Sequence, residues 1–148
     1  MSQPASDPAV ERLRTIAEQW MERVWRQRQL DALDELHAPD FVDRSPAGRD
    51  SGNAAYKAGI AELYRAFPDF YGVTEDLVIE PGSGKVAIRW TATGTHSAPY
   101  LGVAATGKQI MFSGIEIIRV VEDRIVERWG EWDGIALLEQ LGGWSAEK

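Results

Sequence analysis

The chain has 148 residues, of which 44% are apolar, and a formal net charge of −7. This length and apolar fraction are enough for one hydrophobic core, so we expect a single domain over residues 1–148. The negative charge and the lack of a Lys/Arg cluster argue against nucleic acid and against a membrane surface as partners. The chain has no cysteine, which excludes disulfides and Cys-ligated metals and favours a reducing compartment. No apolar targeting segment opens the chain, and we expect a cytoplasmic protein.

Helical periodicity dominates the chain up to Pro68. Residues 1–6 have the composition of a disordered lead, and Asp7 followed by Pro8 is typical of a helix start. Apolar residues then recur at helical spacing to about residue 29. Two further helices are expected, a short one over 31–36 and one that is capped by Ser51 or Asn53 and stopped by Pro68.

After Pro68 the apolar period changes from helical to two, which predicts strands. The expected strands are residues 71–79, 85–96, 108–121 and 124–132, with turns at 81–84 and 122–123 and a long loop over 97–107. Asp133 is placed to cap a closing helix that Gly142 and Gly143 would end. Helices followed by a strand meander predict an α+β fold with a curved antiparallel sheet of about four to six strands.

Two polar side chains fall among apolar neighbours in this meander. Residues two apart share a face of a strand, so His96 lies on the same face as Val86, Ile88 and Trp90. On the next strand, Glu116 shares a face with apolar residues that include Phe112. A carboxyl group in such a row has a raised pKa and suits general acid/base chemistry. We therefore take His96 and Glu116 as candidate catalytic residues, while hydrogen bonding within the core would also explain the histidine.

The last hairpin adds candidates for substrate binding. If Glu122 and Asp123 form a two-residue turn, antiparallel pairing places Glu116 opposite Trp129. Glu127, Glu131 and Asp133 would then share that face, although helix capping alone would explain Asp133. The expected substrate-binding residues, from these strands and the third helix, are Trp90, Phe112, Trp129, Tyr56, Glu131 and Asp133.

The other motifs in the sequence give little evidence of function. The Gly-Ser-Gly-Lys at 82–85 and the Thr-Gly-Lys at 106–108 lack the full spacing of a phosphate loop and are better read as turns. Only two histidines are present, far apart in the sequence, so we expect no metal site. We also find no Ser-centred nucleophile elbow.

A set of short motifs, considered together, resembles the SnoaL-like polyketide cyclases of the NTF2-like superfamily. The motifs are Gly94-Thr95-His96, Thr106-Gly107-Lys108, Ser113-Gly114-Ile115-Glu116, Ile125-Val126-Glu127-Arg128-Trp129 and Trp132-Asp133, with Ala66-Phe67-Pro68-Asp69 upstream. The resemblance implies a cone-shaped domain in which three N-terminal helices and a short C-terminal helix pack on the curved sheet. It also implies a pocket histidine at His96, an acid at Glu116 where the family usually has Asp, no cofactor, and a homodimer.

The resemblance implies a cofactor-independent cyclase or isomerase that acts on a hydrophobic, carbonyl-containing small molecule. Glu116 would remove a proton next to the carbonyl and His96 would donate a hydrogen bond to the enolate oxygen. One alternative is a hydroxylase-like or epoxide-hydrolase-like enzyme. Epoxide opening would require an Asp-Arg-Asp type of network, and strand parity places Arg89 and Arg119 on the wrong face for it. Another alternative is a small-ligand-binding protein without turnover.

Overall fold

The structure, a computed structural model, describes residues 7–144, so the lead predicted for residues 1–6 lies outside the described range. The helical elements are α1 (Pro8–Gln19), its π-helical continuation η1 (Trp20–Arg26), α2 (Ala32–Leu36), α3 (Asn53–Ala66) and α4 (Gly134–Leu141). The strands are β1 (His37–Asp43), β2 (Tyr71–Glu80), β3 (Lys85–Thr95), β4 (Gln109–Val121) and β5 (Arg124–Trp132). Within residues 7–144, no helix has the length and apolar character needed to cross a membrane.

The strands form one curved sheet in the order β1-β5-β4-β3-β2. The four strands from β2 to β5 pair antiparallel, as predicted, and the α+β class is confirmed. The sheet is nevertheless mixed, because β1 pairs parallel to β5 at the edge. The sequence did not reveal β1 as a strand, since Pro39 interrupts its pattern and proline within a sheet is confined to such edge positions.

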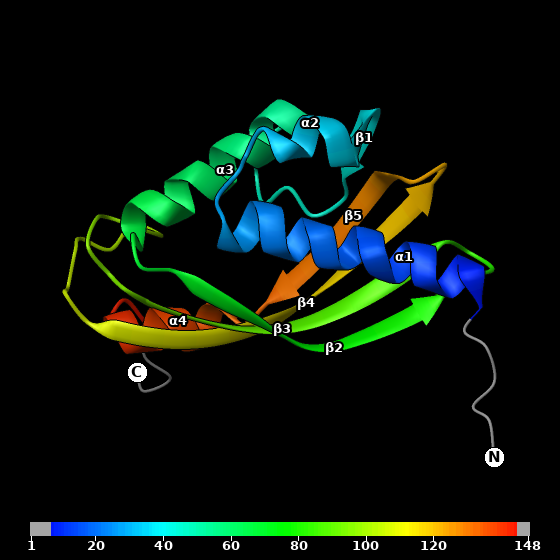
Figure 1. Ribbon diagram of the computed structural model, residues 1–148. Coiled ribbons are helices and arrows are strands. Elements are labelled where there is room, and N and C mark those ends of the chain that lie inside the picture. Colours follow the sequence, from blue (N-terminus) through cyan, green and yellow to red (C-terminus); the bar gives the residue numbers. More distant parts are fainter. Residues whose placement is uncertain (1–6, 145–148) are drawn as a thin grey trace, which may run out of the picture.

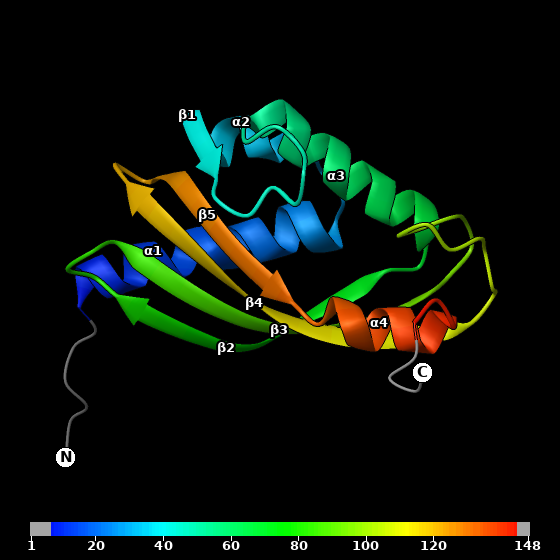
Figure 2. The same ribbon diagram turned by 180° about the vertical axis from the view of Figure 1, so that it is seen from behind.

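The three N-terminal helices cover one face of the sheet (Figures 1 and 2). The apolar stripe of α1 and η1 is buried against that face, and its members are Leu13, Ile16, Ala17, Trp20 and Val24. From β3 and β4, Val86, Ile88 and Ile118 complete this part of the core. A second cluster around Phe67, Phe112 and Leu137 lies where α4 packs against β4. The helices therefore close one side of the curved sheet and leave room between the two layers.

Local capping signals explain three of the helix ends. The Asp7 carboxylate accepts a hydrogen bond from Ala9 N at 2.8 Å, and Asp133 accepts one from Ala136 N at 2.9 Å, as predicted. Gly142 ends α4 with a φ of +80°, a conformation that glycine adopts without strain. The prediction that Ser51 or Asn53 caps α3 is wrong, because Gly52 occupies the N-cap position without a side-chain hydrogen bond. Asn53 instead bonds to two side chains from the α2–β1 segment.

One of these partners is His37, which is buried at the start of β1. Its Nε2 accepts a hydrogen bond from the indole of Trp20 at 3.1 Å, so the ring must carry its proton on Nδ1. Nδ1 lies 2.9 Å from Asn53 Oδ1 and donates to it. Burial lowers the pKa of His37 to about 4, although the Asn53 hydrogen bond opposes this shift. The fold therefore requires a neutral imidazole at this position.

We expect the protein to lose stability as the pH falls from 6.5 towards 4. The unfolded chain takes up a proton on His37 near pH 6.5 while the folded chain resists, so the loss is up to about 1.4 kcal/mol per pH unit. Urea unfolding of the wild type and of a His37→Gln variant at pH 6.5 and pH 5 would measure it. The variant should lose about 1.6 kcal/mol less between these two pH values. An identical pH dependence of the two proteins would contradict the assignment.

Candidate active site

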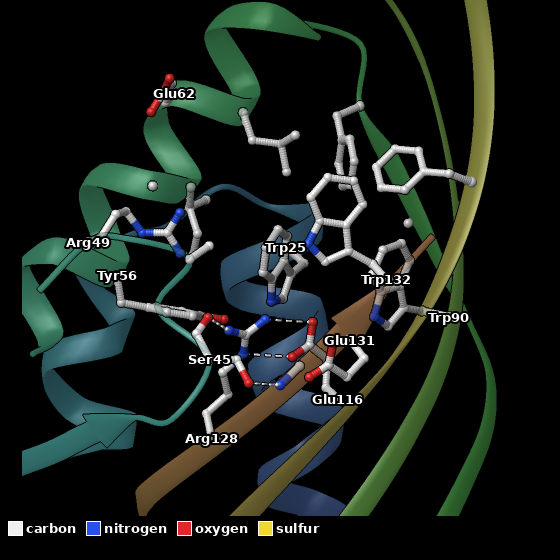
Figure 3. A pocket seen from close by; sticks show the side chains of 18 of the residues that line it. Trp25, Ser45, Arg49, Tyr56, Glu62, Trp90, Glu116, Arg128, Glu131 and Trp132 are labelled. Carbon is white, nitrogen blue, oxygen red and sulfur yellow. Dashed lines mark hydrogen bonds and ion pairs between the residues drawn. The ribbon is translucent and has the colours of Figure 1, made fainter. Parts of the chain in front are cut away.

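A cavity of about 710 Å³ lies between the helices and the covered face of the sheet. Figure 3 shows α3 on one side of it and the aromatic residues of the strands on the other. Its aromatic lining comes from η1, α3, β3, β4, β5 and the loop after β3, and includes Trp25, Tyr56, Trp90, Tyr100, Phe112 and Trp132. Such a size and lining suit an organic molecule with a flat, hydrophobic body.

Glu116 lies in the wall of this cavity, in the middle of β4, and is only 5% exposed. Arg128, from the neighbouring strand β5, binds its carboxylate with two hydrogen bonds (Figure 3). Nε lies 2.6 Å from Oε2 and Nη2 lies 3.0 Å from Oε1. Burial raises the pKa of Glu116, and Arg128 opposes that shift without cancelling it. The predicted carboxyl group with a raised pKa is therefore present in the cavity wall, but it is paired rather than isolated.

Arg128 also contacts a second buried carboxylate. Its Nη1 donates to Asp43 Oδ1 at 3.0 Å and to the Ser45 carbonyl oxygen at 3.3 Å. An arginine has five N–H groups, and these four hydrogen bonds leave one N–H on Nη2. Asp43 is 2% exposed and, unlike Glu116 and Arg128, is not part of the cavity lining. The result is a carboxylate–guanidinium–carboxylate network with only one of its carboxylates at the cavity.

A β-bulge brings Arg128 to this face. The predicted turn is present, because Val121 pairs with Arg124 and both turn residues have positive φ. The register shifts between Arg119 and Val120, so that Val126 is an extra residue in β5. Glu116 consequently pairs with Gly130, and the predicted pairing with Trp129 is wrong. Because strand parity reverses at a bulge, Arg128, Gly130 and Trp132 line the cavity.

Gly130 is needed beside this network. A Cβ at this position would collide with Arg128 Nη2 and Glu116 Oε2, so only glycine leaves the ion pair in place. Its backbone N–H donates to Ser45 Oγ at 3.1 Å, which joins β5 to the segment that follows β1. The network is thus supported by backbone and side chains from both elements.

His96 takes a different position from Glu116. Its ring is fully buried, on the predicted side of the sheet, but it does not line the cavity. Nδ1 accepts a hydrogen bond from Thr106 N at 3.2 Å and lies 3.0 Å from Thr106 Oγ1, which ties the two ends of the 97–107 loop together. The Phe67 ring packs 5.5 Å from it. The catalytic role predicted for His96 stays a prediction, and the donor beside Glu116 is Arg128.

The other predicted site residues divide into two groups. Trp90, Phe112 and Tyr56 line the cavity. Glu131 borders it too, although it is exposed and pairs with the exposed Ile115. Trp129 and Asp133 are not part of the lining. Lys85 Nζ lies 5.1 Å from the centre of the Trp129 ring, and Asp133 caps α4.

Two polar atoms in the lining are buried without a hydrogen-bond partner. These atoms are the indole Nε1 of Trp25 and the hydroxyl oxygen of Tyr56. Buried polar groups are normally paired, so these two atoms are exceptions within the cavity wall. In the part of the chain that the structure describes, no three His, Asp or Glu side chains gather to hold a metal ion.

The family profile of the SnoaL-like polyketide cyclases matches residues 15–141. The chain therefore belongs to this family. No curated protein matches it significantly in sequence.

Solved structures support the same assignment. IdmH from Streptomyces antibioticus, a proposed polyketide cyclase, is 27% identical with a TM-score of 0.75, over 88% of this chain and 98% of that one. AclR from Streptomyces galilaeus, a proposed hydroxylase, is 25% identical with a TM-score of 0.81, over 92% and 88%. A SnoaL-like protein from Jannaschia sp. CCS1 shares the fold, with a TM-score of 0.84 at 18% identity over 97% and 100%. These neighbours establish the NTF2-like fold and include proteins named for two different reactions.

Proposed function

We propose that this protein is a cofactor-independent cyclase or isomerase that acts on a hydrophobic, carbonyl-containing small molecule. The observation that carries the proposal is the Glu116 carboxylate, buried in the wall of an aromatic cavity with a raised pKa. A carboxylate of this kind suits proton transfer near neutral pH. The expected substrate is flat enough to lie against Trp90, Phe112 and Trp132.

In the proposed reaction, Glu116 takes the proton from the carbon next to the carbonyl group. The electron pair of the broken C–H bond moves to the carbonyl oxygen and forms an enolate. Arg128 Nη2 has one N–H that the four hydrogen bonds of the network do not use, and this N–H donates a hydrogen bond to that oxygen. The enolate carbon then attacks a second carbonyl carbon of the same molecule, and the oxygen of that carbonyl takes the proton back from Glu116. In an isomerase, Glu116 instead returns the proton to a carbon of the enolate system. Arg128 takes the role predicted for His96 because it lines the cavity and His96 does not.

Proton transfer can be tested before the natural substrate is known. The purified protein would be incubated with 2-tetralone in deuterated buffer, and loss of the proton signals next to the carbonyl would be followed by NMR. We expect exchange faster than in buffer and faster than with an equal concentration of acetate. No acceleration with 2-tetralone or with other bicyclic aryl ketones would count against the proposal.

The structure also favours a second candidate, epoxide opening. Arg89 and Arg119 point away from the cavity, paired with Asp76 and Glu127, but Arg128 lies between two carboxylates as that reaction would require. We rank it second because Asp43 does not line the cavity, so one carboxylate could not reach a substrate. Incubation with styrene oxide in ¹⁸O-labelled water would separate the two candidates. Formation of labelled diol by the protein, without deuterium exchange into 2-tetralone, would favour epoxide opening. Ligand binding without either reaction would favour a protein without turnover.

A homodimer and a cytoplasmic location also remain proposals. The outer face of the sheet exposes large apolar side chains, among them Val73, Met111 and Ile115, which suits contact with a second copy. Light scattering would give the mass in solution. The cytoplasmic location rests on the lack of cysteine.

A further inference from the structure

The cavity contains an arginine that the network described above does not use. Arg49, in the segment between β1 and α3, lines the cavity and its side chain is 38% exposed. No hydrogen bond of its guanidinium to the rest of the described chain is present. Its one ion pair within 4 Å in the described chain is with Asp43, whose Oδ2 lies 3.9 Å from Nη2, beyond hydrogen-bond distance. At most two of its N–H groups could turn to Asp43, so others stay free to bind a ligand.

The guanidinium of Arg49 lies against α3. A Cβ on Gly59 of α3 would lie 2.8 Å from Arg49 Cζ, so the absence of a side chain there gives the guanidinium its space against the helix. In Figure 3 it lies above the ring of Tyr56, across the cavity from Trp90 and Trp132. The other two arginines of the lining already bind carboxylates, since Arg44 binds Glu127 at 2.8 Å and Arg128 binds Glu116 and Asp43, which leaves Arg128 a single N–H.

We propose that Arg49 is an anion-binding site of the cavity and that the natural substrate is a keto acid with a free carboxylate. This rests on the proposed function, because it names the substrate class of the same cavity. The carboxylate would bind Arg49 while the flat body lies against the aromatic wall opposite. Since the chain has a net charge of −7, an anionic ligand needs such a local cation to bind. Asp43 lies between Arg49 and Arg128, so the acid group would bind one side chain away from the proposed catalytic pair.

The test is equilibrium binding of two probes of the same shape, 2-naphthoate and the neutral 2-naphthamide. Quenching of the tryptophans in the lining would report the affinity. We expect the wild type to bind the acid at least about tenfold more tightly than the amide, because hydrogen bonds to charged groups are the stronger ones. An Arg49→Gln variant should lose this preference and keep its affinity for the amide. The matched variant Arg44→Gln should keep the preference.

A second variant tests whether misfolding, rather than the loss of the guanidinium, explains weaker acid binding. Gly59→Ala should stabilise α3, because glycine is a poor residue inside a helix, yet it displaces the guanidinium and should weaken acid binding. Equal affinity of the wild type for acid and amide, or an acid preference that survives Arg49→Gln, would overturn the proposal. Since binding is measured without turnover, this result does not depend on the exchange assay that tests the proposed function.

Discussion

Replacing Glu116 with glutamine is expected to slow deuterium exchange into 2-tetralone by about 10²–10⁴-fold, the usual contribution of a positioned general base. Glutamine keeps the length of the side chain but cannot accept the proton. Because burial raises the pKa of Glu116, the exchange rate of the wild type should fall as the pH drops below that raised pKa, where the carboxyl group is protonated. This acidic decline should be absent in the variant.

Glu62→Gln is the matched control for this experiment. Glu62 also borders the cavity, but it is exposed and belongs to α3, on a different wall from the network. The same chemical change there should leave exchange within about twofold of the wild type. If the Glu116→Gln protein exchanged as fast as the Glu62→Gln protein, the base would have to be another group.

Replacing Arg128 with methionine should destabilise the protein by about 3–5 kcal/mol at pH 7, the usual cost of removing one partner of a buried ion pair. The change leaves the carboxylates of Glu116 and Asp43 buried beside each other without a cation. The destabilisation should shrink between pH 7 and pH 5, because protonation of a carboxyl group removes the unpaired charge. Urea unfolding at both pH values would measure the difference.

Arg119→Met serves as the comparison. Arg119 is about one-third exposed and pairs with Glu127, so its loss should cost less than about 1 kcal/mol. Similar losses for the two variants would mean that the Asp43–Arg128–Glu116 network does not depend on charge pairing. A stable Arg128→Met protein would also allow the proposed enolate donor to be tested directly by exchange.

Elements governed by local signals could be predicted from the sequence. The buried stripe of α1, the four strands from β2 to β5, and the caps at Asp7, Asp133 and Gly142 follow from periodicity and from side chains within a few residues. Glu116 could be recognised because a carboxylate in an apolar row is costly unless it is paired or used.

Elements that depend on distant partners could not be predicted from the sequence. β1 is a strand because β5 lies beside it, and its own proline hides the pattern. The position of Arg128 could not be predicted because strand parity holds only within an uninterrupted ladder. The extra residue is a valine, and no glycine or proline beside it indicates a bulge in the sequence. Arg49 reaches the cavity from a loop, where no periodicity exists to place it.

The bulge at Val126 also means that the pairing register, rather than residue choice, sets the chemistry of the β5 wall. If Val126 were paired with Arg119 instead of being bulged out, regular pairing from the turn would bring Glu127, Trp129 and Glu131 to the face now held by Arg128, Gly130 and Trp132. Glu116 would then face further acids instead of its cation. A change that closes this bulge at constant chain length would therefore convert a cationic wall into an anionic one, which gives evolution and protein engineers a short route to a different reaction on the same scaffold.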